Sequence, residues 1–176
     1  MKSNEVLKTI KKRRSIYKYN DEEVSKEEID TVLEAGRWAP SFANLQPWKF
    51  VVIRDSETKK RLHKIAQRVT IFREGVEQAP VVIAVVTNQE EDPSHYVEAG
   101  AVASQNMALA AHSIGLSSYW IGVFDVASEK DSAEKNVKEV LDLSKDERVI
   151  SLLPLGRTNQ VRTGERKDLE EMVIRR

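Results

Sequence analysis

Two adjacent arginines followed by a serine form the motif of this chain that is best suited to binding an anion. The motif reads KKRRS and contains Arg13, Arg14 and Ser15. A guanidinium group carries a permanent charge and a planar set of donors that match phosphate oxygens in pairs. Taken alone, the same charges could simply complement the C-terminal end of a helix dipole. A second basic cluster, Arg157 and Arg166–Lys167, comes late in the chain.

The segment WAPSFANLQPWKF, residues 38–50, places bulky aromatic and amide side chains between a helical pattern and a strand pattern. A helix stop such as Pro40 explains only part of this composition, because a simple connection needs no tryptophan or amide. We expect Trp38 to lie in the core, and Gln46 and Trp48 to anchor the loop. The remaining side chains of the segment are therefore candidates for function.

Nucleophilic and metal chemistry have little support in the sequence. The chain contains no cysteine, which excludes disulfides, thiolate nucleophiles and cysteine-held metals. Its histidines, His63, His95 and His112, follow no metal-ligand spacing and no triad motif. We expect His63 to face solvent and His112 to be packed near a helix end. Because a glycine-rich phosphate loop is also missing, a bound nucleotide would have to be held by side chains.

Charge and length limit the class of protein. Lys and Arg together number 28, as do Asp and Glu, so the formal net charge is zero, and a nucleic-acid partner is not expected. No run of apolar residues approaches the ~18 that a membrane span needs, and the N-terminus lacks a signal-peptide pattern. We expect one domain over residues 1–176, without a membrane partner and located in the cytoplasm.

Apolar periodicity predicts helices that alternate with strands. Ser25 and Glu28 form a capping-box pattern at the start of one helix, with Val24 and Ile29 placed as a hydrophobic staple. The run PVVIAVVT has no polar alternation, which indicates a strand covered on both faces. Helices are expected at about 6–10, 26–36, 57–67, 98–116, 132–143 and in the tail 166–176, and strands at 49–54 (buried), 80–87, 117–124 and 148–156.

Four blocks that occur in one order carry a family resemblance. They read RRSIYKY, APSFANLQPWKFVVI, EAGAVASQNMALAAHSIGLSSYWIG and LLPLGR…RKDLEEMV. This set closely resembles the nitroreductase family of flavoproteins over about residues 7–173. The resemblance implies an α/β (α+β) fold, a three-layer sandwich in which helices flank a central, mostly antiparallel sheet. The chain would be a compact member of the family.

The resemblance also implies non-covalent FMN at the interface of a homodimer, with each site built from both chains. Arg13, Arg14 and Arg166 would bind the phosphate end, residues 40–46 would reach the partner's flavin, and residues 120–122 would lie along the ring edge. Gln46 is expected to tie its own loop together. The implied cofactor-binding residues are Arg13, Arg14, Ser15, Tyr17, Pro40, Ser41, Phe42, Asn44, Gln46, Trp120, Ile121, Gly122, Gly156 and Arg166.

The chemistry implied by the resemblance is a ping-pong hydride transfer. NAD(P)H would reduce the flavin, and an electron-poor acceptor such as a nitroaromatic compound or a quinone would then reoxidise it. The cofactor carries this reaction, so no catalytic side chain and no metal ligand are assigned. The sequence contains no pocket pattern that distinguishes NADH from NADPH, and it does not identify the physiological acceptor.

Two departures from the family pattern stand out. Many members place Arg or Lys two residues after RRS, where this chain has Tyr17, and Lys18 would point to the opposite side of an extended segment. We therefore expect a lower flavin reduction potential than in members with the basic residue. The connections between elements are also short, so the site is either open or roofed by residues 70–78.

Other functions fit the same sequence. Relatives of this fold remodel flavin or remove halide from aromatic rings, and a flavin-binding store or sensor would need little turnover. A structural or interaction domain without flavin is a further alternative. Two observations distinguish these functions: whether the protein binds flavin, and whether a nicotinamide cofactor bleaches the bound flavin.

Overall fold

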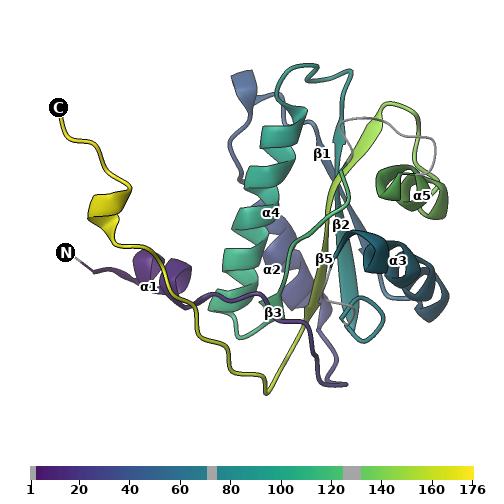
Figure 1. Ribbon diagram of the computed structural model, residues 1–176. Coiled ribbons are helices and arrows are strands. Elements are labelled where there is room, and N and C mark those ends of the chain that lie inside the picture. Colours follow the sequence, from purple (N-terminus) through teal and green to yellow (C-terminus); the bar gives the residue numbers. More distant parts are fainter. Residues whose placement is uncertain (1–2, 71–74, 125–131) are drawn as a thin grey trace.

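The computed structural model describes residues 3–70, 75–124 and 132–176 (Figure 1). Helices and strands alternate along most of the chain, and two short 3-10 helices (η1 and η2) lie outside this pattern. The helices are α1 Glu5–Lys12, α2 Lys26–Arg37, η1 Phe42–Asn44, α3 Ser56–Val69, α4 Tyr96–Ser113, α5 Ala133–Val140 and η2 Leu169–Glu171. The strands are β1 Trp48–Ile53, β2 Val81–Asn88, β3 Ser117–Ser118, β4 Ile121–Gly122 and β5 Glu147–Gly156.

Side-chain caps mark the starts of α1, α2, α3 and α5. At α2 the Ser25 hydroxyl accepts from the Glu28 N–H at 3.2 Å, and the Glu28 carboxylate accepts from the Ser25 N–H at 2.9 Å. This is the capping box that the sequence predicts. Val24 and Ile29 are both buried in the same core cluster, as expected of a hydrophobic staple. Local sequence therefore determines the start of α2.

The described strands form an antiparallel sheet in the order β1-β2-β5-β3, with β4 also paired to β5. Helices α2 and α4 cover one face, and α3 and α5 cover the other (Figure 1). Along β2, Val82 and Ala84 pack in the α3/α5 core, whereas Val81 and Ile83 pack in the α2/α4 core. Both faces of β2 are therefore buried, and the predicted three-layer sandwich is confirmed.

Three expectations about elements are wrong. β1 is an edge strand, and of its residues only Ile53 is fully buried, because half of its backbone has no neighbouring strand to cover it. The strand expected over 117–124 is interrupted at residues 119–120, which leaves the two short strands β3 and β4. The tail forms a single 3-10 turn, η2, rather than a regular helix.

Helix α4 lies across the middle of one face of the sheet. Its small residues permit close contact, since a Cβ atom added at Gly100 would come within 2.4 Å of Ile150 Cγ1. Its 18 residues span about 27 Å. In the part of the chain that the structure describes, no helix combines the length and apolar character needed to cross a membrane.

Candidate functional site

Basic side chains from three separate elements gather at the C-terminal end of α4. Arg13 is the C-cap of α1, Arg14 follows it, His112 lies in the last turn of α4, and Arg166 comes from the tail. Burial and then the charges of Arg14 and Arg166 lower the pKa of Arg13. Burial, followed by Arg13, Lys12 and Arg14, lowers the pKa of His112. Because the arginines repel one another, an anion bound among them would be stabilised.

Arg14 has a donor that none of the described residues uses. Its Nη1 donates to the carbonyl oxygens of Lys11 at 2.6 Å and Arg13 at 2.8 Å. Its Nε is buried, and no described residue accepts a hydrogen bond from it. A Cβ atom placed on Gly164 would lie 3.1 Å from this Nε, so a glycine lets the tail pass closely. A phosphate group fits this set of donors, because its oxygens accept charged hydrogen bonds from guanidinium groups.

Ser15 and Tyr17 lie beside the segment that carries the predicted ring-edge residues. Ser15 forms an isolated β-bridge with Ser118. The N–H of Ile16, the residue after Ser15, donates to the Ser118 carbonyl at 3.1 Å. The Tyr17 ring meets the Tyr119 ring edge-on at 4.8 Å between centroids. The structure thus brings the RRS motif together with β3 and the residues that follow it.

The residues of the 120–122 segment differ in what they can offer to a ligand. Trp120 is 41 % exposed, and Gly122 is exposed beside it. The Ile121 side chain is buried in the α3/α5 core, so only its backbone is available. Gly156, another predicted contact, is buried where an added Cβ would lie 2.7 Å from Pro80 Cδ and 2.9 Å from Tyr19 Cδ1. Close packing thus requires a glycine at 156, and a role for it toward a cofactor stays a prediction.

The loop that follows α2 is closed by its own polar groups. The Ser41 hydroxyl accepts from the Gln46 N–H at 2.9 Å, and Gln46 Nε2 donates to the Asn44 carbonyl at 3.2 Å. Ala43, Asn44 and Gln46 all have positive φ angles, of 46°, 58° and 53°. Left-handed backbone costs about 1–2 kcal/mol per non-glycine residue, and such strain clusters at functional sites. Gln46 therefore anchors the loop, as its amide suggested.

The other loop residues point outward. Phe42 is 58 % exposed, and Asn44 and Pro40 are exposed as well, while Ser41 is partly buried. The Phe42 ring stacks on His95, with 4.6 Å between centroids and 24° between planes. This contact was not evident from the sequence, because a lone histidine outside any motif gives no signal.

His95 is in turn held by a buried carboxylate. Its backbone N–H donates to Asp92 Oδ1 at 2.9 Å, and its Nδ1 lies 3.6 Å from the same oxygen. Asp92 is 1 % exposed, and its Oδ2 has no hydrogen-bond partner among the described residues. A carboxylate buried in this way is costly unless a donor compensates it. The pair fixes the surface on which Phe42 rests.

The predicted site residues form two separate groups in one chain. His95, the N-cap of α4, contacts the loop through Phe42, whereas His112 at the other end of α4 lies in the arginine cluster. The length of α4 separates these groups by about 27 Å. One chain therefore does not bring residues 40–46 to the cations at residues 13–14.

Two side chains lie elsewhere than the sequence suggested. Trp38, expected in the core, is 72 % exposed because it follows the last turn of α2; its indole N–H donates to Glu34 at 2.6 Å, and Arg37 lies over its ring. His63, expected to face solvent, is half-buried and lies 2.9 Å from the Gln67 amide. Of the possible roof 70–78, residues 71–74 lie outside the described residues.

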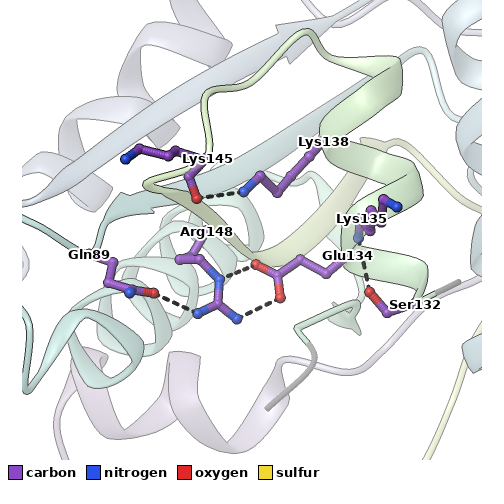
Figure 2. Close-up of a pocket in the computed structure, with 7 residues that line it drawn as sticks. All are labelled: Gln89, Ser132, Glu134, Lys135, Lys138, Lys145 and Arg148. Carbon is purple, nitrogen blue, oxygen red and sulfur yellow. Dashed lines mark hydrogen bonds and ion pairs between the residues drawn. The ribbon is translucent and has the colours of Figure 1, made fainter. Parts of the chain in front are cut away.

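A cavity of about 320 Å³ lies away from these groups, between α5 and the start of β5 (Figure 2). Arg148 crosses it and forms two hydrogen bonds to Glu134, at 2.7 and 2.9 Å, and a third to Gln89 at 2.8 Å. The hydrogen bonds that Arg148 donates to Glu134 raise the pKa of Arg148. Lys138 donates to the Lys145 carbonyl at 2.9 Å. These charges are used within the protein, so we interpret the cavity as a structural junction.

Comparisons with known proteins agree with the fold. The sequence model described as "Nitroreductase family" matches residues 10–72 and 66–157. A protein of Methanothermobacter thermautotrophicus, provisionally named NADH dehydrogenase/NAD(P)H nitroreductase, is 36 % identical over 154 residues, which cover 86 % of this chain and 76 % of that protein.

Two further relatives extend the comparison. A provisionally named nitroreductase of Desulfovibrio desulfuricans, solved in complex with FMN, superposes with a TM-score of 0.81 at 31 % identity and covers 99 % of this chain and 98 % of that one. The iodotyrosine deiodinase of Nematostella vectensis is 26 % identical over 205 residues, 98 % of this chain and 75 % of that protein. With a family match over most of its length, the chain belongs to the nitroreductase family.

Proposed function

We propose that the protein is an FMN-dependent oxidoreductase that takes reducing equivalents from NAD(P)H and passes them to electron-poor acceptors such as nitroaromatic compounds and quinones, in ping-pong order. The observation that carries the proposal is the cluster of Arg13, Arg14 and Arg166, with a buried Arg14 Nε that lacks a partner among the described residues. Membership of the nitroreductase family supports it. When bound, FMN supplies the hydride chemistry.

The chain's own residues bind and orient the cofactor in this proposal. Arg13, Arg14 and Arg166 neutralise its phosphate, with planar donors matched to the phosphate oxygens. Ser15, which bridges to Ser118, and residues 120–122, which follow β3 along the chain, serve the ring end. No acid, base or nucleophile is assigned, because the reaction needs none from the protein.

We further propose that two copies of the chain form a dimer and share each site. In one chain the 40–46 loop and the arginine cluster lie at opposite ends of α4, so one cofactor can meet both only if a second copy supplies the loop. The 40–46 loop and its surroundings have an apolar surface, because Trp38, Phe42 and Leu45 are exposed there. A cavity of about 440 Å³ beside the loop has a mixed lining of Leu33, Trp48 and Phe50 with Asp30, Glu34, Arg37 and Gln46. Sedimentation showing an FMN-loaded monomer would contradict this arrangement.

An absorbance spectrum tests the function directly. Purified protein, or protein soaked with FMN, is expected to show the yellow flavin bands. Anaerobic NADH or NADPH is expected to bleach these bands, and a quinone to restore them. Flavin that binds but is bleached by neither nucleotide would indicate a store or sensor, and a protein that stays colourless would indicate a structural domain.

Removing the two polar side chains of the loop is expected to weaken FMN retention. The Ser41→Ala/Asn44→Ala variant loses the Ser41–Gln46 bond and the outward amide of Asn44, so we expect the dissociation constant of FMN to rise about tenfold, or ~1.4 kcal/mol. Thermal unfolding of the apoprotein controls for stability. FMN that stays as tightly bound as in the wild type would show that this loop does not serve the cofactor.

The deiodinase relatives support a second candidate function, reductive removal of halide from an aromatic ring. Iodotyrosine deiodinase of Nematostella vectensis aligns over 98 % of the chain. The discriminating assay supplies iodotyrosine to the reduced protein and measures released iodide. Turnover of iodotyrosine in preference to quinones would favour this second function over the first.

A further inference from the structure

The C-terminal tail is fixed to the body at the point where it leaves β5. Arg157 donates to Glu28 Oε1 at 2.5 Å and to the Glu23 carbonyl at 3.1 Å. The Asn20 N–H donates to the Arg157 carbonyl at 2.8 Å. From here the tail runs toward α1, and the two segments leave the sandwich together (Figure 1). The first residues of the tail therefore have a defined direction.

Arg162 makes a second contact between the tail and the body. Its guanidinium lies 4.6 Å from the centroid of the Tyr17 ring, within the range of a cation–π interaction. The ring is itself held in place, because it packs edge-on against Tyr119, which is buried in the α3/α5 core. Because the core fixes the Tyr17 ring, its face can hold a side chain from an otherwise exposed segment in a defined position.

The position of Arg162 determines where the following residues lie. Two residues on, Gly164 passes so close to Arg14 that an added Cβ would be 3.1 Å from its Nε. Two residues further, Arg166 is near enough to Arg13 to help lower its pKa. Arg166 Nη1 donates to the neighbouring Glu165 carbonyl, a contact within the tail itself. The Arg162 contact is therefore placed to hold this part of the tail against the cations of the body.

We propose that Tyr17 and Arg162 form a clasp that holds tail residues 157–166 over Arg13 and Arg14 and so positions Arg166 for the phosphate group of FMN. The inference rests on the proposed function for its ligand. Both members are positioning residues, since they act through Arg166. This explains why position 17 is aromatic where the family resemblance expects a basic residue, because a lysine or arginine there would repel Arg162.

The test compares clasp variants with a matched loss of charge. Arg162→Met and Tyr17→Leu each remove one member, Tyr17→Phe retains the ring face, and Arg176→Met removes a tail arginine outside the clasp. Dissociation constants are measured for FMN and for riboflavin, which has the same ring without the phosphate. Cleavage after Glu165 by a glutamyl endopeptidase is measured in protein without flavin, and circular dichroism checks the fold of each variant.

The clasp predicts a definite pattern. Arg162→Met is expected to weaken FMN binding about tenfold and riboflavin binding less than about twofold, and to speed cleavage after Glu165 about fivefold. Tyr17→Leu is expected to do the same, its combination with Arg162→Met to add little, and Tyr17→Phe and Arg176→Met to resemble the wild type.

Other results would overturn the clasp or the function separately. Unchanged cleavage in Arg162→Met, which alters an exposed side chain and should not affect folding, would overturn the clasp. Equal weakening of FMN and riboflavin would also overturn it, because Arg162 would then serve the ring. A wild-type protein that binds neither flavin would overturn the proposed function instead, whatever the cleavage rates show.

Discussion

Replacing Arg14 with methionine is expected to raise the dissociation constant of FMN about 100-fold, or ~2.7 kcal/mol, and to leave riboflavin within about twofold. Arg14 Nε is a buried donor without a partner among the described residues, and Arg13 and Arg166 add charge around it. A charge-assisted hydrogen bond to phosphate is among the strongest single contacts a side chain makes. Fluorescence titration of flavin with the apoprotein measures both constants.

Two further variants make this result specific. Arg14→Lys keeps the charge but loses the planar fork, so its FMN affinity should lie between those of the wild type and the methionine variant. Arg61→Met removes an exposed arginine from α3, on the other face of the sheet, and should change nothing. If Arg14→Met weakens FMN and riboflavin equally, then Arg14 acts by closing the end of α1, whose Lys11 carbonyl it already contacts.

Glu134→Ala is expected to lower the free energy of unfolding by about 3–5 kcal/mol. Glu134 is 4 % exposed and accepts hydrogen bonds from Arg148 Nε and Nη2 (Figure 2). It also accepts one from the Val149 N–H at 3.1 Å. Alanine would leave the partly buried Arg148 guanidinium without its carboxylate and the buried Val149 N–H without an acceptor. Urea-induced unfolding, followed by circular dichroism, measures the change.

The exposed ion pair on α2 is the matched control. Lys26 and Asp30 pair on the helix surface, so Asp30→Ala should cost no more than about 1 kcal/mol. Glu134→Leu combined with Arg148→Met should recover much of the loss, because an apolar pair leaves no uncompensated charge. A Glu134→Ala variant as stable as Asp30→Ala would show that water or neighbouring groups replace the carboxylate.

Features determined by short stretches of sequence could be predicted. The Ser25–Glu28 capping box needs only four residues, and the unbroken apolar run of β2 indicated burial on both faces before any neighbour was known. The four family blocks named the cations at 13 and 14, whose proximity to Arg166 the structure shows.

Features that depend on the order of the strands or on contacts distant in sequence could not be predicted. The exposure of β1 follows from its place at the sheet edge. An apolar run in the sequence looks alike for an edge strand and for a strand in the middle of a sheet. Trp38 was misplaced because a tryptophan after a helix stop can turn inward or lie on its own last turn. The stacking of Phe42 on His95 and of Arg162 on Tyr17 joins residues that no local pattern connects.

The separation of the two groups along α4 has a consequence for heredity as well as for binding. Under the proposed pairing, each copy lends its loop to one site and its arginines to the other. A copy with a damaged loop and a copy with damaged arginines would then make, when paired, one site with no damage and one with both defects. Two inactive alleles could complement each other, so the unit exposed to selection is the pair of copies and not the single chain.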